Sequence, residues 1–184
     1  MKYIGSKEEY DVLVSIRKPH TDNIFDNRKV IEWRTQKMPL GRHYCYESKS
    51  GGGAGKVIGE YIVADVLAFP CIDAISNEVI VLGCVSRKFL REYSRGKTLY
   101  AHVIVRAKRY ETPLELGYFF KPCIKSGYPW CFDCEYGLSK NEPRPFGVKR
   151  YFDVPCQNYH KRPPQSWYYV QTAIKGGKEK CSNG

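Results

Sequence analysis

The chain has 184 residues, a length typical of one domain. Its hydrophobic content of 42% is enough for a packed core and excludes a chain that is disordered throughout. The formal net charge of +11 favours an anionic partner, with nucleic acid first, then a phosphorylated metabolite or an anionic membrane surface. A basic surface that only confers solubility is the alternative reading of the same charge.

The N-terminal stretch is charged and has no apolar segment of the kind found in secretory signals. No run approaches the roughly 18 consecutive apolar residues that a membrane span needs. We therefore expect a cytoplasmic protein with no membrane partner. In that compartment the eight cysteines are expected to be free thiols or metal ligands, because disulfides are rare there.

The first half of the chain predicts strands more often than helices. An apolar run at 11–16 predicts a strand, and 20–29 predicts a short helix with a polar cap near its start. Further strands are expected from the alternating or β-branched patterns that follow. They cover 30–34, 42–48 and 56–69, with a glycine-rich loop tip at 49–55.

The second half contains one more clear helix and two more strands. Residues 86–94 predict the helix, and 99–111 and 166–171 predict the strands. The helices do not alternate regularly with the strands, which argues against a parallel α/β fold. We expect an α+β, mostly β domain, a small β-barrel with two or more short helices.

One domain spanning 1–184 is expected, with an irregular cysteine-rich insertion at 119–161 and a flexible tail at 172–184. The insertion is rich in Pro, Gly, Cys and aromatic residues and has little periodicity. Four of its cysteines are Cys123, Cys131, Cys134 and Cys156, with a C-x2-C pair in the middle. Such a pair binds one tetrahedral ion well, so these four residues predict a structural zinc site. His160 is an alternative fourth ligand, and ordinary thiols are the competing interpretation.

The strand at 99–111 is expected to be two-faced. Its even-numbered positions form a basic and aromatic face, and within it His102, Arg106 and Lys108 are candidate nucleic-acid contacts. On the strand at 56–69, Glu60 shares its predicted face with apolar residues. Either a bulge turns this carboxylate outward, or it lies near a barrel mouth and meets a cation.

The stretch "NRKVIEWR" places Lys29, Glu32 and Arg34 on and beside a short strand. Because side chains alternate along a strand, Glu32 and Arg34 share one face. Arg34 is suited to hold a phosphate or a carbonyl, and Lys29 can act as nucleophile or base if burial lowers its pKa. The competing interpretation is a structural ion pair between Glu32 and Arg34 that fixes the strand register and is worth little if it is exposed.

The order of these features resembles the ASCH domain of the PUA-like superfamily. The resembling pieces are "VSIRKPHTDNIFDNRKVIEWR", "GKVIGEYIV", "SRKFLREYSRGKTLYAHVIV", "TPLEL" and "RPPQSWYYV". In that family a helix leads into a strand with the pattern Lys-x-x-Glu-x-Arg, which falls here on Lys29, Glu32 and Arg34. The family usually has Gly two residues before the lysine, where this chain has Asn27, and Asn also tolerates the left-handed conformation. The "PPQSW" ending looks like that of bacterial and prophage ASCH proteins.

The resemblance implies a small β-barrel with a basic cleft that binds RNA or a nucleotide. The residues expected to bind the ligand are Arg17, Lys18, Lys29, Glu32, Arg34 and Glu60. The alternative it implies is a hydrolase acting on a modified nucleoside or nucleic acid, of amidohydrolase or ribonuclease type, with Lys29 and Glu32 as catalytic residues. Small amidohydrolase members carry Thr at the position of Glu32, and their second acid has only Glu78 as its nearest counterpart here. A third possibility is a protein-interaction module with a basic surface.

Overall fold

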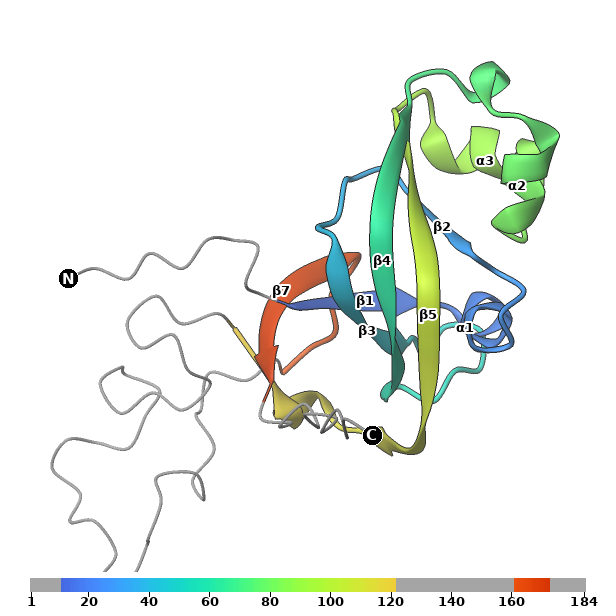
Figure 1. The fold of residues 1–184 in the computed structure, drawn as a ribbon. Helices are drawn as coiled ribbons and strands as arrows, with labels where there is room; N and C mark the ends of the chain where they lie inside the picture. Colours follow the sequence, from blue (N-terminus) through green and yellow to red (C-terminus); the bar gives the residue numbers. More distant parts are fainter. Residues whose placement is uncertain (1–10, 122–160, 173–184) are drawn as a thin grey trace, which may run out of the picture.

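The computed structural model describes residues 11–121 and 161–172 and shows a bent sheet with short helices beside it (Figure 1). The strands are β1 (Asp11–Ile16), β2 (Ile31–Arg34), β3 (Gly41–Glu47), β4 (Val57–Phe69), β5 (Leu99–Leu114), β6 (Phe119–Phe120) and β7 (Trp167–Thr172). The helices are α1 (Lys18–Phe25), α2 (Asn77–Leu82) and α3 (Arg87–Ser94), with 3-10 turns η2 (Ile72–Ala74) and η3 (Leu116–Tyr118). The α+β, mostly β class expected from the sequence is confirmed.

The sheet is open rather than closed. Its strand order is β2-β5-β4-β3-β1-β7-β6, and every neighbouring pair is antiparallel except β1 and β3. Within the described ranges β2 and β6 are therefore edge strands, and the barrel predicted from the sequence does not close. The sheet stays open because β2, with four residues, forms backbone hydrogen bonds only to β5 among the strands of this sheet.

Bulges in the β4–β5 ladder change which residues of β5 face inward. The register shifts between Ile62 and Val63 and again between Val63 and Asp65, which leaves Val105 without a partner opposite it. Val105 is consequently 62% exposed, whereas Ile104 is 7% exposed and joins the core. Strict alternation along 99–111 predicted the reverse for these two residues.

Three hydrophobic clusters hold the sheet and helices together. The first fills the space inside the bent sheet under α1, the second lies between β2, β5 and the helices α2 and α3, and the third lies on the other face of β1 and β3. Their buried residues include Val12, Val14, Tyr61 and Val63 in the first cluster, Trp33, Leu90 and Leu99 in the second, and Leu13, Tyr44 and Phe119 in the third. Because β1 is buried on both faces, it reads as a continuous apolar run rather than an alternating one.

The helices at 20–29 and 86–94 were predicted nearly in place, but α2 was not predicted. Helix α1 starts earlier, at Lys18, since Pro19 suits the first turn of a helix. Helix α2 begins after Ser76, whose hydroxyl accepts from the Val79 amide, and ends at Gly83. Its six residues are mostly β-branched or apolar and do not show a helical pattern on their own.

The cysteines of the described residues differ in exposure. Cys45 lies in the core, Cys84 is half-buried, and Cys71 is exposed. Cys123, Cys131, Cys134, Cys156 and His160 lie outside the described residues, as does nearly all of the 119–161 insertion and the tail beyond Thr172. In the described ranges no helix is long and apolar enough to cross a membrane.

The turn between α1 and β2 uses a left-handed residue. Asn27 has φ of +57°, and the following amides of Arg28 and Lys29 both donate to the Asn23 carbonyl. Asn therefore takes the position at which the ASCH pattern carries Gly, as the sequence led us to expect. This turn sets the direction in which Lys29 enters the protein.

Replacing Asn27 tests this turn. A residue with a plain Cβ in the left-handed region costs roughly 1–2 kcal/mol. We expect Asn27→Ala to lower the free energy of unfolding by about that amount relative to Asn27→Gly. Urea denaturation of the two variants measures the difference, and equal stabilities would contradict the assigned conformation.

Candidate functional site

Lys29, Glu32 and Arg34 form one buried ionic group. Lys29 Nζ lies 3.3 Å from Glu32 Oε2, and Arg34 donates to Glu32 Oε1 at 2.9 Å. The three residues are 2%, 6% and 8% exposed. They do not belong to an exposed hairpin, and the ion pair between Glu32 and Arg34 is buried rather than exposed. We refer to Lys29, Glu32 and Arg34 below as the ionic group.

Each cation of the ionic group also binds a backbone carbonyl from another part of the fold. Lys29 Nζ donates to the Gly83 carbonyl at 2.7 Å, at the end of α2. Arg34 donates to the Ser15 carbonyl of β1 at 2.9 Å. Neither carbonyl could be identified from the sequence, because any residue carries one. The ionic group thus joins β2 to β1 and to the segment between α2 and α3.

The charges inside the group stabilise one another. Burial by itself raises the pKa of Glu32, but Lys29 and Arg34 outweigh it, and the pKa of this carboxyl lies below its ordinary value. Burial alone lowers the pKa of Arg34, and Glu32 more than reverses that effect. Two cations therefore share one carboxylate, which leaves a surplus of positive charge in a buried place.

Two buried histidines support the ionic group as neutral rings. His102 Nε2 accepts from the Met38 amide at 2.9 Å, so Nδ1 carries the proton and donates to the Glu32 carbonyl at 3.1 Å. Burial lowers the pKa of His102, and it lowers the pKa of His43 to about 4. His102 is 0% exposed, so its predicted place in a surface stripe is not where the structure puts it.

Several buried polar atoms around the ionic group have no hydrogen-bond partner among the described residues. They include Arg34 Nε, His20 Nδ1, His43 Nδ1 and the Tyr61 hydroxyl. Buried polar atoms normally have a partner, which is often ordered water. Unpartnered groups beside an excess of positive charge mark this region as the candidate functional site.

The remaining predicted ligand residues lie in two different places. Arg17 and Lys18 are exposed at the start of α1, and the Arg17 charge acts on His20. Glu60 is instead on the face of β4 that meets the third cluster, where it accepts from Tyr110 at 2.7 Å and pairs with Arg42 at 3.4 Å. The structure therefore brings Glu60 to a cation, as one of the two sequence alternatives stated, but away from the ionic group.

The basic residues of β5 face outward. Arg106 and Lys108 are both exposed, and they lie beyond the bulge that separates them from His102. Ala107 between them packs against the first cluster, so the two basic side chains point to the opposite side. The predicted stripe is thus reduced to these two residues.

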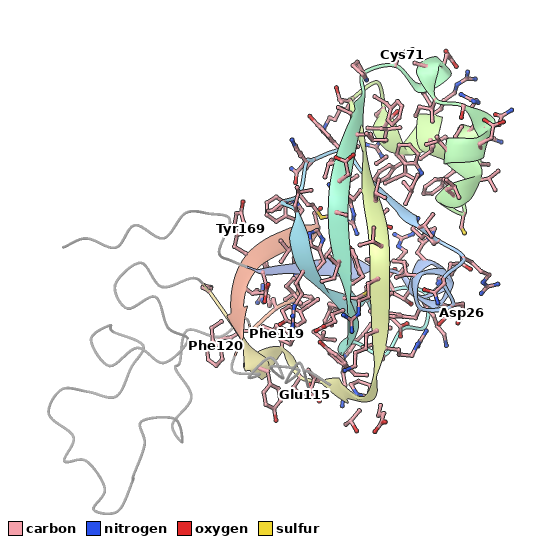
Figure 2. The ribbon with its side chains drawn as sticks, in the orientation of Figure 1. Asp26, Cys71, Glu115, Phe119, Phe120 and Tyr169 are labelled. Carbon is pink, nitrogen blue, oxygen red and sulfur yellow. The ribbon has the colours of Figure 1, made fainter. Side chains whose placement is uncertain are left out.

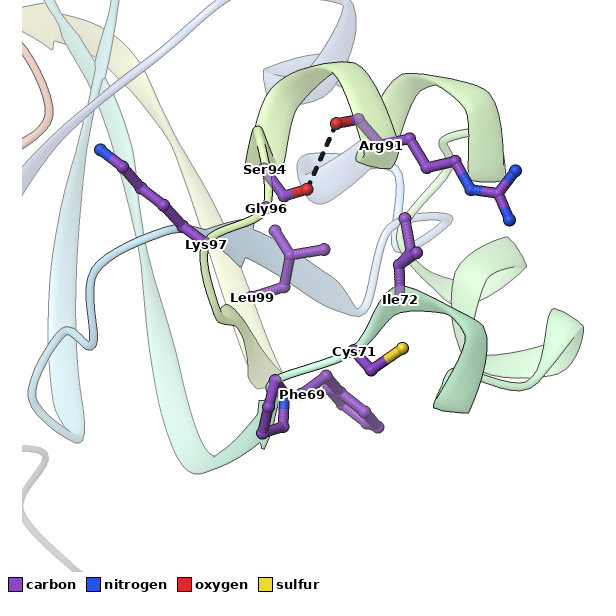
Figure 3. A pocket seen from close by; sticks show the side chains of 9 residues that line it. Phe69, Cys71, Ile72, Arg91, Ser94, Gly96, Lys97 and Leu99 are labelled. Atoms are coloured by element: carbon purple, nitrogen blue, oxygen red, sulfur yellow. Dashed lines mark hydrogen bonds between the residues drawn. The ribbon is translucent and has the colours of Figure 1, made fainter.

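A shallow pocket of about 290 Å³ lies near the far end of α3 (Figure 3). Phe69, Cys71, Arg91 and Lys97 are among the residues that line it. The Arg91 guanidinium forms an ion pair with Asp73 Oδ1 at 2.6 Å. None of the residues predicted to bind a ligand lines this pocket, and Figure 2 shows Cys71 at the end of the molecule remote from Phe119 and Phe120.

Metal ligands are not gathered in the described part of the chain. Across 11–121 and 161–172, no three His, Cys, Asp or Glu residues are placed to hold a metal ion. The four cysteines predicted to bind zinc lie outside these ranges.

Comparison with known structures identifies the fold. No protein-family model and no curated protein sequence matches the chain. The crystal structure of ASCH from Zymomonas mobilis matches with a TM-score of 0.52 at 16% identity, over 60% of this chain and 76% of that one. A single-residue variant of the same protein matches with a TM-score of 0.58 at 13% identity, over 90% of this chain and 92% of that one. The chain therefore shares the fold of these ASCH structures, as the sequence resemblance predicted.

Removing the charge of Glu32 tests the ionic group. Breaking a buried ion pair by removing one partner costs about 3–5 kcal/mol, so we expect Glu32→Gln to lower the free energy of unfolding by about that amount. Because the folded-state pKa of Glu32 is depressed, its contribution is present at neutral pH and is lost as the pH falls below the ordinary value of 4.5. The variant should therefore show a weaker acid destabilisation than the wild type.

A matched control is Glu115→Gln. Glu115 pairs with Lys56 at 2.7 Å, but the two side chains are 64% and 44% exposed. An exposed pair is worth about 0–1 kcal/mol. Chemical denaturation of both variants between pH 3 and pH 8 makes the comparison, and similar losses in the two would contradict the special position of Glu32.

Proposed function

We propose that this protein is a nucleic-acid-binding domain that takes RNA or a nucleotide at the ionic group and the basic residues beside it. The main supporting observation is the surplus of buried positive charge, together with the unpartnered donor Arg34 Nε. An anionic ligand would neutralise the surplus charge, and an anionic or carbonyl oxygen would accept a hydrogen bond from Arg34 Nε. The formal net charge of +11 and the ASCH fold agree with this reading.

The exposed lysine and arginine side chains supply the first contacts in this proposal. Arg17 and Lys18 lie at the start of α1, next to the ionic group, and their charges are open to solvent. Arg106 and Lys108 form a second exposed basic site on β5. Phosphates would meet these side chains, while the more buried donors would meet the base or the sugar.

The hydrolase and the protein-interaction module remain alternatives. A hydrolase would use Lys29 as nucleophile or base, but Lys29 Nζ already donates to Gly83 and lies beside Glu32. A lysine attacking a carbonyl would have to leave both partners. No observation on the described residues favours this chemistry over binding.

Salt-dependent binding tests the proposal. Each phosphate that is neutralised on a single strand contributes a slope of roughly −0.7 to the dependence of log affinity on log salt. We expect a single-stranded RNA oligonucleotide to bind at low salt and to weaken steeply as salt rises, measured by fluorescence anisotropy. Lys18→Ala should lower the affinity and reduce the slope by about 0.7.

Lys121→Ala is the matched control, because Lys121 is an exposed lysine that follows β6 on another part of the fold. It should leave the slope unchanged. No binding of RNA or DNA at low salt would overturn the proposal, and salt-insensitive binding of a protein partner would favour the protein-interaction alternative.

We also propose a structural zinc site formed by Cys123, Cys131, Cys134 and Cys156, with His160 as a possible replacement for one of them. The proposal rests on the spacing of these residues in the sequence, and they lie outside the described ranges. Four thiolates fill one tetrahedral site.

Elemental analysis of protein purified without chelators should find about one zinc per chain. Cys131→Ser should lower the zinc content, whereas Cys45→Ser should retain it, since Cys45 is a buried core residue. Protein that contains no metal would refute the site.

A further inference from the structure

Helix α3 exposes two aromatic rings on one side. Leu90 and Ser94 are buried against the core, whereas Phe89 and Tyr93 are 42% and 37% exposed. The two rings are one helical turn apart and nearly parallel, at 6° with centroids 5.9 Å apart. Leu90 already anchors the helix, so core packing does not account for a pair of exposed rings.

A third ring, from α1, lies beside Phe89. The His20 ring lies 6.2 Å from the Phe89 ring, centroid to centroid, and is tilted by 49° against it. His20 is half-buried, and its Nδ1 atom is buried without a hydrogen-bond partner. Figure 1 shows β2 running between α1 and the helices α2 and α3. We refer to His20, Phe89 and Tyr93 as the aromatic triplet.

The charges of the ionic group reach the aromatic triplet. The charge of Lys29 acts on His20, and the charge of Arg34 acts on Tyr93, whose hydroxyl also interacts with Thr35, the residue after Arg34. Burial and then Lys29 lower the pKa of His20, and burial raises the pKa of Tyr93. Both side chains are therefore neutral near pH 7, which suits them to stacking rather than to ion pairing.

We infer that the aromatic triplet is a stacking platform for an unpaired nucleobase, so that the ligand of the proposed nucleic-acid site is single-stranded. This inference rests on the proposed function and specifies its ligand. Base stacking on aromatic rings is tolerant of sequence, because every base has a π face. His20 Nδ1 is the polar atom of the triplet that lacks a partner within the described residues.

Charge distinguishes a nucleic acid from an apolar protein segment as the occupant. Arg17 and Lys18, both exposed, lie one turn or less from His20 on the same chain segment, where phosphates flanking a stacked base would meet them. A base in a duplex has its faces covered by its neighbours. The platform therefore requires an unpaired base.

The experiment measures binding of a short RNA that carries one 2-aminopurine, whose fluorescence is quenched when the base stacks. Phe89→Leu keeps an apolar side chain but removes the ring, and it should lower affinity about tenfold and reduce the quenching. Tyr93→Leu should act in the same direction. Phe89→Trp and Tyr93→Phe keep a ring and should bind within about twofold of the wild type.

The control for loss of an exposed apolar side chain is Val81→Ala. Val81 lies on α2 and is 69% exposed, and its replacement should change neither affinity nor quenching. Thermal melting of each variant checks that the fold is retained, which exposed positions should allow. The same RNA annealed to its complement should bind more weakly than the single strand.

The outcomes separate this inference from the proposed function. If wild-type protein binds neither RNA nor DNA at low salt, the proposed function fails. If it binds with the expected salt slope but Phe89→Leu and Tyr93→Leu are unchanged, the stacking platform alone is overturned. Equal affinity for the duplex and the single strand would likewise overturn the platform. So would leucine variants that keep the wild-type affinity for RNA but bind a protein partner more weakly.

Discussion

The carboxylate of Glu32, buried between Lys29 and Arg34, is the interaction on which the arrangement of the other elements depends. Burying charged groups costs free energy, and Coulomb attraction offsets the cost only when the remaining hydrogen bonds are satisfied. Here the Gly83 and Ser15 carbonyls accept from the two cations. Ser15 lies in β1, which does not pair with β2, so Arg34 joins two strands that the sheet leaves apart. Lys29 adds its side-chain bond to a backbone bond from the Val30 amide to the Leu82 carbonyl at 3.0 Å.

This arrangement also explains how an open sheet can bend so strongly. In a closed barrel the last strands would be joined by a ladder of backbone hydrogen bonds, and edge strands left open invite pairing with other chains. The edge strand β2 has only four residues, and Arg34 reaches from it to β1 through a side chain. On its other face Trp33 packs beside Leu90 and Leu99 in the cluster covered by α2 and α3. The edge is thus short and partly covered.

The longer strands could be predicted from the sequence because their patterns depend on neighbours close along the chain, whereas β6, with two residues, falls in the segment predicted as an irregular insertion. The pairing of Glu32 with Arg34 followed from strand alternation alone. What could not be predicted depends on distant contacts. The bulges of β4 and β5 move Val105 outward and Ile104 inward, and nothing in the run 99–111 marks the point at which alternation breaks. Helix α2 had real signals, Ser76 at its start and Gly83 at its end, but its apolar run has no helical period. The partners of Lys29 and Arg34 are backbone carbonyls, which every residue carries, so the sequence does not indicate them.

If the proposed function holds, burial gives the residues around β2 different roles in recognition. The ionic group is too deeply placed for a flexible phosphate chain to run over all three side chains, since none of the three residues is more than 8% exposed. Exposed cations such as Arg17 and Lys18 can attract a polyanion without selecting its sequence, because phosphates are the same at every nucleotide. Selectivity must then come from groups that meet a base, and those near β2 are rings and single polar atoms such as Arg34 Nε. Under the proposal, the buried charges hold the elements in place and meet only the single group of the ligand that reaches Arg34, the surface charges supply affinity, and the rings stack on an unpaired base.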